Sequence, residues 1–215
     1  MAYNSGNSYQ RITPIVLNLI IINVLVWLAQ VVMDKSDSYS FWLTSKIGLF
    51  PLDSGEFKPY QLVTYMFAHS SYSITGNVVF FHILFNMYAL WMFGTALERV
   101  WGPKRFLIFY LACGLAAGIT QMFVADSITV GASGAVMGLL AGFAYLFPNT
   151  EFFLFPVPFP IKAKFMVGIY AAIDLFGGLH PGKADNVAHY AHLSGLVMGF
   201  IIVIIWNKTN KKTFY

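Results

Sequence analysis

Four polar residues stand inside strongly apolar segments, and their types and spacing suit nucleophilic chemistry. Ser133 lies in the run GASGAVMG, which opens an apolar segment, His192 lies in AHYAHLSG, and His82 and Asn86 are four residues apart in HILFN. Polar groups in apolar helices are costly, which makes them candidates for function by default. An imidazole within hydrogen-bond reach of a hydroxyl can remove its proton and make it a nucleophile, so Ser133 and His192 are candidates for a serine–histidine pair.

The same segments offer donors for the negative charge that forms when a hydroxyl attacks a carbonyl. Residues four apart share one face of a helix, so His82 and Asn86 can aim at one point. Ser133 is expected in the first turn of a helix, where unpaired backbone N–H groups and the positive end of the helix dipole favour an oxyanion. We therefore predict Ser133 and His192 as catalytic residues, and His82, Asn86 and the Ser133 N–H as the oxyanion site.

Each of these residues alone has a simpler explanation. Ser133 could be a small packing residue, and Asn86 could tie two membrane helices together. His82, His189 and His192 could bind a metal, but without a nearby carboxylate or an HExxH pattern that signal is weak, so we predict no metal and no cofactor. For His189 we favour packing or hydrogen-bond support. The prediction therefore depends on the residues occurring together.

Two carboxylates also lie at the ends of apolar segments. Asp174, in AAIDLFGG, could orient a catalytic histidine and complete a triad, but we favour a residue at the rim that is hydrogen-bonded near the helix end. Glu98 is interpreted as a structural hydrogen-bond partner rather than an acid catalyst. Neither residue enters the predicted catalytic set.

Composition places the chain in a membrane. Of its 215 residues, 58% are hydrophobic and 10% are charged, and the mean hydropathy is +0.65, whereas soluble domains carry roughly 25% charge. The single cysteine, Cys113, excludes a disulfide framework and is interpreted as inert filler. The basic residues form no stripe, so no nucleic-acid partner is predicted despite a net charge of +4. The lipid bilayer is the expected surrounding.

Six apolar stretches approach the roughly 20 residues that a helix needs to cross a bilayer. They cover residues 14–33, 77–97, 106–125, 131–147, 165–179 and 187–206. The first is longer than a signal-peptide core and has no cleavage site after it, so we interpret it as a retained helix. The predicted fold is an all-α integral membrane bundle: a single six-helix domain over residues 14–206, with short tails at 1–13 and 207–215.

The distribution of Lys and Arg predicts the orientation, because cytoplasmic loops keep positive charge. With the N-terminus inside, nine basic residues fall in inner segments and four in outer loops. Both termini are therefore predicted to be cytoplasmic, in a plasma (inner) membrane protein. The connection over residues 34–76 is long and aromatic, which predicts short helices in the lipid interface and favours a structural rather than a catalytic role.

Depth and glycine spacing predict that the polar residues meet. His82 and His192 lie about 7 and 9 Å inward from the outer ends of their predicted spans, and the short fourth span allows Ser133 the same level. Glycines at 134, 138 and 142 and at 195 and 199 repeat every fourth residue, so the two helices can approach closely. That packing brings Ser133 and His192 near hydrogen-bond distance.

At these residues the chain resembles the rhomboid family of intramembrane serine proteases. HILFN resembles the family's His-x-x-x-Asn, GASGA its nucleophile motif and AHLSG its catalytic histidine helix, and ERVWGPKRF resembles a charged turn of bacterial members. The resemblance covers nearly the whole chain. Four residues after the serine, where some members carry an aromatic ring that stacks on the histidine, this chain has Met137.

The resemblance implies a function. Ser133 attacks and His192 is the base and then the acid, with no third carboxylate, while His82, Asn86 and the Ser133 N–H hold the oxyanion. Expected substrates are transmembrane proteins cut near the outer end of a membrane segment. Two alternatives remain: a catalytically silent rhomboid-like protein that binds membrane clients, and, less favoured, a small transporter lined by the polar residues. The oligomeric state stays open.

Overall fold

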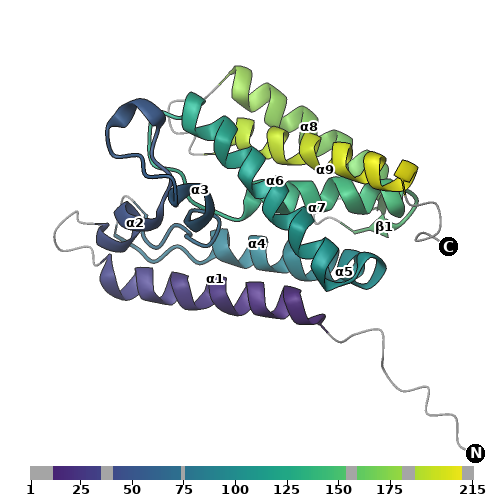
Figure 1. The fold of residues 1–215 in the computed structure, drawn as a ribbon, viewed down its shortest axis with the longest axis horizontal. Helices are drawn as coiled ribbons and strands as arrows, with labels where there is room; N and C mark the ends of the chain where they lie inside the picture. The colour runs from purple at the N-terminus through teal and green to yellow at the C-terminus, as the bar shows by residue number, and fades with distance from the viewer. Residues whose placement is uncertain (1–11, 35–40, 74–75, 154–158, 181–186, 210–215) are drawn as a thin grey trace, which may run out of the picture.

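The computed structural model describes residues 12–34, 41–73, 76–153, 159–180 and 187–209 as a bundle of helices (Figure 1). Its longer elements are α1 (Pro14–Met33), α4 (Phe81–Ala89), the π-helical η4 (Leu90–Gly94), α5 (Thr95–Trp101), α6 (Pro103–Val124), α7 (Ser133–Leu146), α8 (Ala163–Leu179) and α9 (His189–Thr209). The predicted all-α membrane fold is confirmed. The start of α1 and the end of α9 lie at the same end of the bundle (Figure 1).

Within the described ranges, three helices are long and apolar enough to cross a membrane, namely α1, α6 and α9. The other predicted spans correspond to the continuous helical run α4–η4–α5 and to the shorter helices α7 and α8, of 14 and 17 residues. At 1.5 Å per residue these two rise about 21 and 25 Å, less than the roughly 30 Å of hydrocarbon. Six crossings therefore stay a prediction.

The predicted bounds of the second span, 77–97, are wrong by about one turn. The helix begins at Phe81, because Val78 pairs with Tyr72 in an isolated β-bridge and the Val79 N–H donates to the Ser71 carbonyl at 2.9 Å. β-branched residues suit this extended backbone. At its other end the run continues to Trp101 and stops at Gly102, whose φ of 77° is outside the helical range.

Helix α7 lies at the centre of the bundle and packs most extensively on α9 and then on α6. A Cβ on Gly195 would collide with the Gly134 carbonyl oxygen, and one on Gly199 would lie 2.6 Å from the Gly138 carbonyl oxygen. The predicted contact of these glycine faces is confirmed. Gly142 differs from the prediction, since it faces Phe109 and Trp101 rather than α9.

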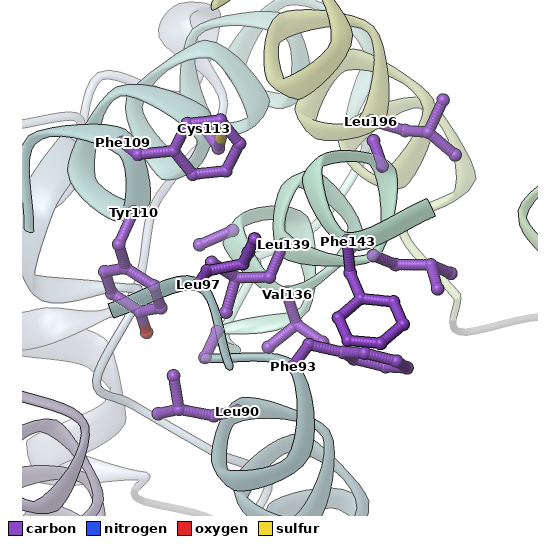
Figure 2. Close-up of a cluster of buried hydrophobic side chains, with 14 of the residues drawn as sticks. Leu90, Phe93, Leu97, Phe109, Tyr110, Cys113, Val136, Leu139, Phe143 and Leu196 are labelled. Atoms are coloured by element: carbon purple, nitrogen blue, oxygen red, sulfur yellow. The ribbon is translucent and has the colours of Figure 1, made fainter. Parts of the chain in front are cut away.

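Aromatic and aliphatic side chains fill the space around α7 (Figure 2). Phe93, from the π-helical segment, lies against Phe143 with ring centroids 5.2 Å apart. Cys113 is buried beside Gly138, where it acts as a small packing group. At the end opposite the polar residues, two strands of two residues each, β1 (Glu151–Phe152) and β2 (Ile161–Lys162), pair antiparallel between α7 and α8.

Glu98 has the structural role that we predicted. Its two carboxylate oxygens accept the backbone N–H groups of Ile15 at 3.1 Å and Val16 at 2.9 Å, and the side chain is 3% exposed. These are donors of the first turn of α1, which have no partner within the helix. Glu98 therefore caps α1 from α5 and fixes the two helices together.

The connection between α1 and α4 is partly helical, as predicted. It contains α2 (Trp42–Ile47), the 3-10 turn η3 (Leu52–Ser54) and α3 (Gln61–Thr64), which gather at one end of the bundle (Figure 1). A buried polar network ties it to α1: Asp34 accepts the Thr44 hydroxyl at 2.6 Å, and Gln30 donates to the same hydroxyl at 2.6 Å. Buried polar groups paired in this way hold a loop firmly.

The contact of α7 with α9 can be tested by adding one methyl group. Gly195→Ala meets backbone that cannot rotate away, so we expect it to destabilise the protein by about 1–3 kcal/mol and to lower its melting temperature in detergent. The matched control is Gly168→Ala on α8, where nothing lies within 4 Å of an added Cβ. Because alanine favours a helix over glycine by roughly 1 kcal/mol, the control should lose no stability. Equal melting temperatures for the two variants would contradict the close contact.

Candidate active site

The predicted site residues lie at the starts of three helices. Ser133 is the first residue of α7, His82 is the second residue of α4, and His192 lies in the first turn of α9. These helix starts are at the same end of the bundle, beside the connection that carries α2 and α3 (Figure 1). The first turn of a helix has backbone N–H groups without intrahelical partners, so this end of the bundle is rich in donors.

The segment before Ser133 is fixed by the long connection. Thr129 and Leu49 exchange two backbone hydrogen bonds at 2.8 and 2.9 Å, and the Gly131 N–H donates to the Tyr65 carbonyl at 3.0 Å. Gly131 has a φ of 131°, which favours glycine. The favoured structural role of residues 34–76 thus has a specific form: this connection sets where α7 begins and so where Ser133 lies.

His82 Nε2 and the Ser133 hydroxyl both lie close to Gly131. The point where a Gly131 Cβ would stand is 3.0 Å from His82 Nε2 and 3.6 Å from Ser133 Oγ. The Ser70 backbone N–H, which can only donate, lies 3.3 Å from His82 Nδ1. Nδ1 is therefore the acceptor, and the neutral ring carries its proton on Nε2. His82 therefore presents an N–H donor to the space at Gly131 that the Ser133 hydroxyl also borders.

Asn86 lies one turn further along α4 and is 7% exposed. Its Nδ2 donates to the His82 carbonyl at 2.8 Å, which fixes the side chain against its own helix. An amide nitrogen carries two hydrogens, so one remains for a second acceptor. The predicted shared face of His82 and Asn86 is therefore present in the structure.

The helices that carry Ser133 and His192 are in contact through residues next to these two. Gly134, next to Ser133, contacts Gly195, and the point of a Gly134 Cβ is 3.4 Å from the carbonyl oxygen of Ala191, the residue before His192. In the described part of the chain no hydrogen bond joins the Ser133 hydroxyl to His192. Catalytic hydrogen bonds in enzymes without substrate are often long and tighten on binding.

The sequence analysis placed Asp174 at the rim of the bundle, and the structure places it in the interior. The side chain is 4% exposed rather than at an open rim. Its Oδ1 lies 2.8 Å from His189 Nδ1 and 3.1 Å from His192 Nδ1. The favoured hydrogen-bonding role of His189 is confirmed, and its partner is this carboxylate.

A cavity of about 500 Å³ opens beside these residues. Its walls include His82 from α4, His189 and Tyr190 from α9, the glycines 177 and 178 at the end of α8, and the segment 124–130 before α7. The cavity therefore gives a route from the end of the bundle to the edge of the site. Within the described ranges, no group of three or more His, Cys, Asp or Glu side chains could hold a metal ion.

Comparison with known proteins decides the family. The family model described as Rhomboid domain matches residues 56–208. The chain belongs to the rhomboid family. This confirms the resemblance carried by HILFN, GASGA and AHLSG, and this rhomboid is accordingly a membrane-embedded protein.

Several relatives of this rhomboid are named proteases. It is 35% identical over 120 residues to the rhomboid protease GluP of Bacillus subtilis, covering 55% of this chain and 22% of GluP. It is 30% identical over 132 residues to the rhomboid protease GlpG of Haemophilus influenzae, covering 61% and 66%. A match to the putative rhomboid protease YdcA of Bacillus subtilis has 27% identity over 198 residues and covers 91% and 89%. The matched part spans less than two thirds of the first two relatives and most of the third.

His69 is a further part of this rhomboid's site that sequence reasoning missed. It is fully buried, and its ring stands edge-on to the His82 ring with centroids 5.1 Å apart. Burial, and then the nearby His82, lower the pKa of His69 to about 3, so the ring is neutral. Its packing fixes the orientation of His82. The available signal was a histidine in the aromatic run YMFAHSS, close to the start of the second predicted span.

The space between His82 and Ser133 can be tested at Gly131. Gly131→Ala places a methyl between the two side chains and forces an unfavourable backbone angle, so we expect the Ser133 hydroxyl to react at least about tenfold more slowly with a fluorophosphonate probe, a change worth about 1.4 kcal/mol. The matched control is Gly102→Ala, which has the same kind of backbone strain at a φ of 77° but nothing within 4 Å of the new Cβ. Equal slowing in both variants would mean that strain alone, and not the site, is responsible.

Proposed function

We propose that this protein is a serine endopeptidase that cleaves transmembrane segments of other proteins within the membrane. The observation that carries the proposal is the cluster of helix starts: the Nε2 edge of His82 and the Ser133 hydroxyl face one point, and α9 brings His192 to the same end through the Gly134–Gly195 contact. The named proteases among its relatives support the same activity.

The proposed reaction follows from the groups at this point. Ser133 Oγ attacks the scissile carbonyl carbon while its proton passes to His192 Nε2. The carbonyl oxygen becomes an oxyanion and is held by His82 Nε2–H, Asn86 Nδ2–H and the Ser133 backbone N–H. When the intermediate collapses, His192 returns the proton to the leaving amine and an acyl-enzyme remains. Water then attacks the acyl carbon while His192 takes a proton from it, and His192 returns this proton to Ser133 Oγ as the acid product leaves.

The bilayer constrains which bonds can be cut. A peptide bond inside a membrane helix is held in internal hydrogen bonds, because lipid offers none, so the substrate must unwind locally before attack. We propose that cleavage occurs near the outer end of the substrate's membrane segment. We also propose that the protease lies in the plasma membrane with both of its termini in the cytoplasm. The cavity beside His82 and His189 supplies the water that hydrolysis consumes.

Replacement of the nucleophile tests the proposal. Ser133→Ala should abolish cleavage of a co-reconstituted transmembrane substrate, with a loss of at least about 10³-fold, because alanine has no hydroxyl to attack the scissile carbonyl. The matched control is Ser127→Ala, a serine on the cavity wall, which should cleave at nearly the native rate. Product formation is followed by gel shift in liposomes, and thermal unfolding checks that both variants are folded.

Two results would count against this proposal. Cleavage that survives in Ser133→Ala would remove the nucleophile. The native protein could instead bind the substrate without cleaving it and without reacting with a fluorophosphonate. That result would support the alternative that the protein is catalytically silent and binds membrane clients.

The oxyanion site makes a separate prediction. Because its donor acts on charge that forms only in the transition state, His82→Ala should lower kcat by about 10²–10³-fold and change KM little. Phe81→Ala is the control on the same turn of α4, since the Phe81 side chain is 68% exposed. Steady-state cleavage of the reconstituted substrate separates kcat from KM. A His82→Ala variant with native kcat would place the oxyanion elsewhere.

A further inference from the structure

The two ends of the bundle differ in their exposed charge. The turn between α5 and α6, the start of α8 and the end of α9 lie together at the end opposite the candidate active site (Figure 1). In the described part of the chain this end has one exposed acid, Glu151, and the following basic side chains: Arg99, Lys104, Arg105, Lys162, Lys164 and Lys208. The exposed charges described at the site end are Lys46, Lys58, Asp53, Glu56 and Asp126. Positive charge is therefore concentrated away from the site.

Half of these basic side chains have a neighbour within the protein. Lys162 is the cross-strand partner of Glu151 in the β1–β2 pair. Lys164 Nζ lies 5.2 Å from the ring centroid of Phe165, and Arg99 also makes a contact within the protein. The basic side chains that form no ion pair within the described ranges are Lys104, Arg105 and Lys208.

An edge-to-face contact of two tryptophans brings the segments that carry these three cations together. The ring centroids of Trp101, at the end of α5, and Trp206, in the last turn of α9, are 5.3 Å apart, with an interplanar angle of 89°. Lys104 and Arg105 follow Trp101 after a two-residue turn, and Lys208 follows Trp206 by two residues. The α5–α6 turn and the last turn of α9 therefore form one basic surface.

The start of α6 adds to this positive charge. A helix start carries a positive dipole end, which favours acidic side chains in the first turn. The first turn of α6 contains no acid and no side chain caps it, and Lys104 and Arg105 are its second and third residues. Glu98, the nearest acid in the sequence, is already bonded to two N–H groups of α1. An anion from outside the chain would balance the charge of this turn.

Apolar side chains beside the cations indicate what kind of anion fits. Ile108, one turn along α6 from Lys104, and Ile205, on the last two turns of α9, are both exposed. Tryptophans such as Trp206 are typical of the level of lipid headgroups. A ligand that matches both the cations and the apolar side chains has an anionic head and apolar tails. A phospholipid has this chemistry, whereas a free phosphate has only the head.

We propose that the α5–α6 turn and the last turn of α9 form a binding surface for an anionic phospholipid. The phosphate lies against Lys104, Arg105 and Lys208, and the acyl chains run along Ile108 and Ile205. At the proposed cytoplasmic face, this surface meets a leaflet whose anionic lipids carry negative charge. The bound lipid ties α6, on which α7 packs, to that leaflet. This binding is independent of the proposed protease activity.

Lipid binding to the unaltered protein is the first test. Native mass spectrometry of the full chain in detergent compares phosphatidylglycerol with phosphatidylcholine of the same acyl chains. Phosphatidylglycerol should bind at least about fivefold more tightly, because each basic residue near a membrane surface attracts anionic lipid. An excess of inorganic phosphate should not displace it. Equal binding of the two lipids, or displacement by phosphate, would overturn the inference.

Two double variants with the same loss of charge locate the surface. Lys104→Gln with Arg105→Gln should weaken phosphatidylglycerol binding by on the order of tenfold. The matched control, Lys46→Gln with Lys58→Gln at the other end of the bundle, should stay within about twofold of native, since distant exposed charges are screened by salt. Thermal unfolding checks that both proteins are folded. Equal weakening in both would mean that binding follows net charge, and the inference would fail.

A third double variant separates the tryptophan-linked surface from the rest of the same end. Lys162→Gln with Lys164→Gln removes the same charge from the start of α8, where both lysines already have neighbours. Its binding of phosphatidylglycerol should weaken by less than about threefold. A loss as large as that of the variant at residues 104 and 105 would place the lipid elsewhere on this end and contradict the proposed surface.

Discussion

The site depends on one backbone contact between α7 and α9. Gly134 and Gly138 face Gly195 and Gly199 so closely that a side chain on α9 would collide with carbonyl oxygens of α7. In lipid there is little hydrophobic force to press helices together, so close van der Waals contact between smooth surfaces has to do it. Ser133 directly precedes the first of these glycines. A shift of either helix would therefore change the position of Ser133 relative to α9.

A second constraint sets the height of Ser133 on α7. The residues before it are held by backbone hydrogen bonds to Leu49 and Tyr65, and the connection that contains them is tied to α1 through Asp34 and Gln30. The hydrogen bond from the His69 N–H to Gln30 is buried, where a hydrogen bond is stronger and its loss costs more. A connection with no predicted catalytic residue thus determines the start of the helix that carries Ser133. The position of Ser133 is fixed by backbone hydrogen bonds to the residues before it and by the glycine contact directly after it.

Much of this arrangement was predictable because it follows from spacing. A four-residue glycine repeat predicts a smooth helix face, and the contact of that face with α9 is present. The start of α4 could not be predicted from hydropathy, because Val78 and Val79 have the same hydropathy in an extended bridge as in a helix. The environment of Asp174 was missed for a different reason: sequence gives its depth on α8 but not the rotation of α8 about its axis, which decides between rim and interior.

The positions of the polar residues also explain how reactive groups are tolerated in an apolar bundle. His82, Ser133 and His192 all lie in first turns, where the backbone itself has unpaired donors and a positive dipole end. Asp174 brings the opposite charge from the far part of α8, and it meets donors on α9 rather than lipid. Each polar group is thus oriented by another: His82 by contact with His69 and Ser70, and Asp174 by two imidazoles. Because these partners come from different parts of the fold, the contacts that hold the bundle together also orient the polar side chains at this end.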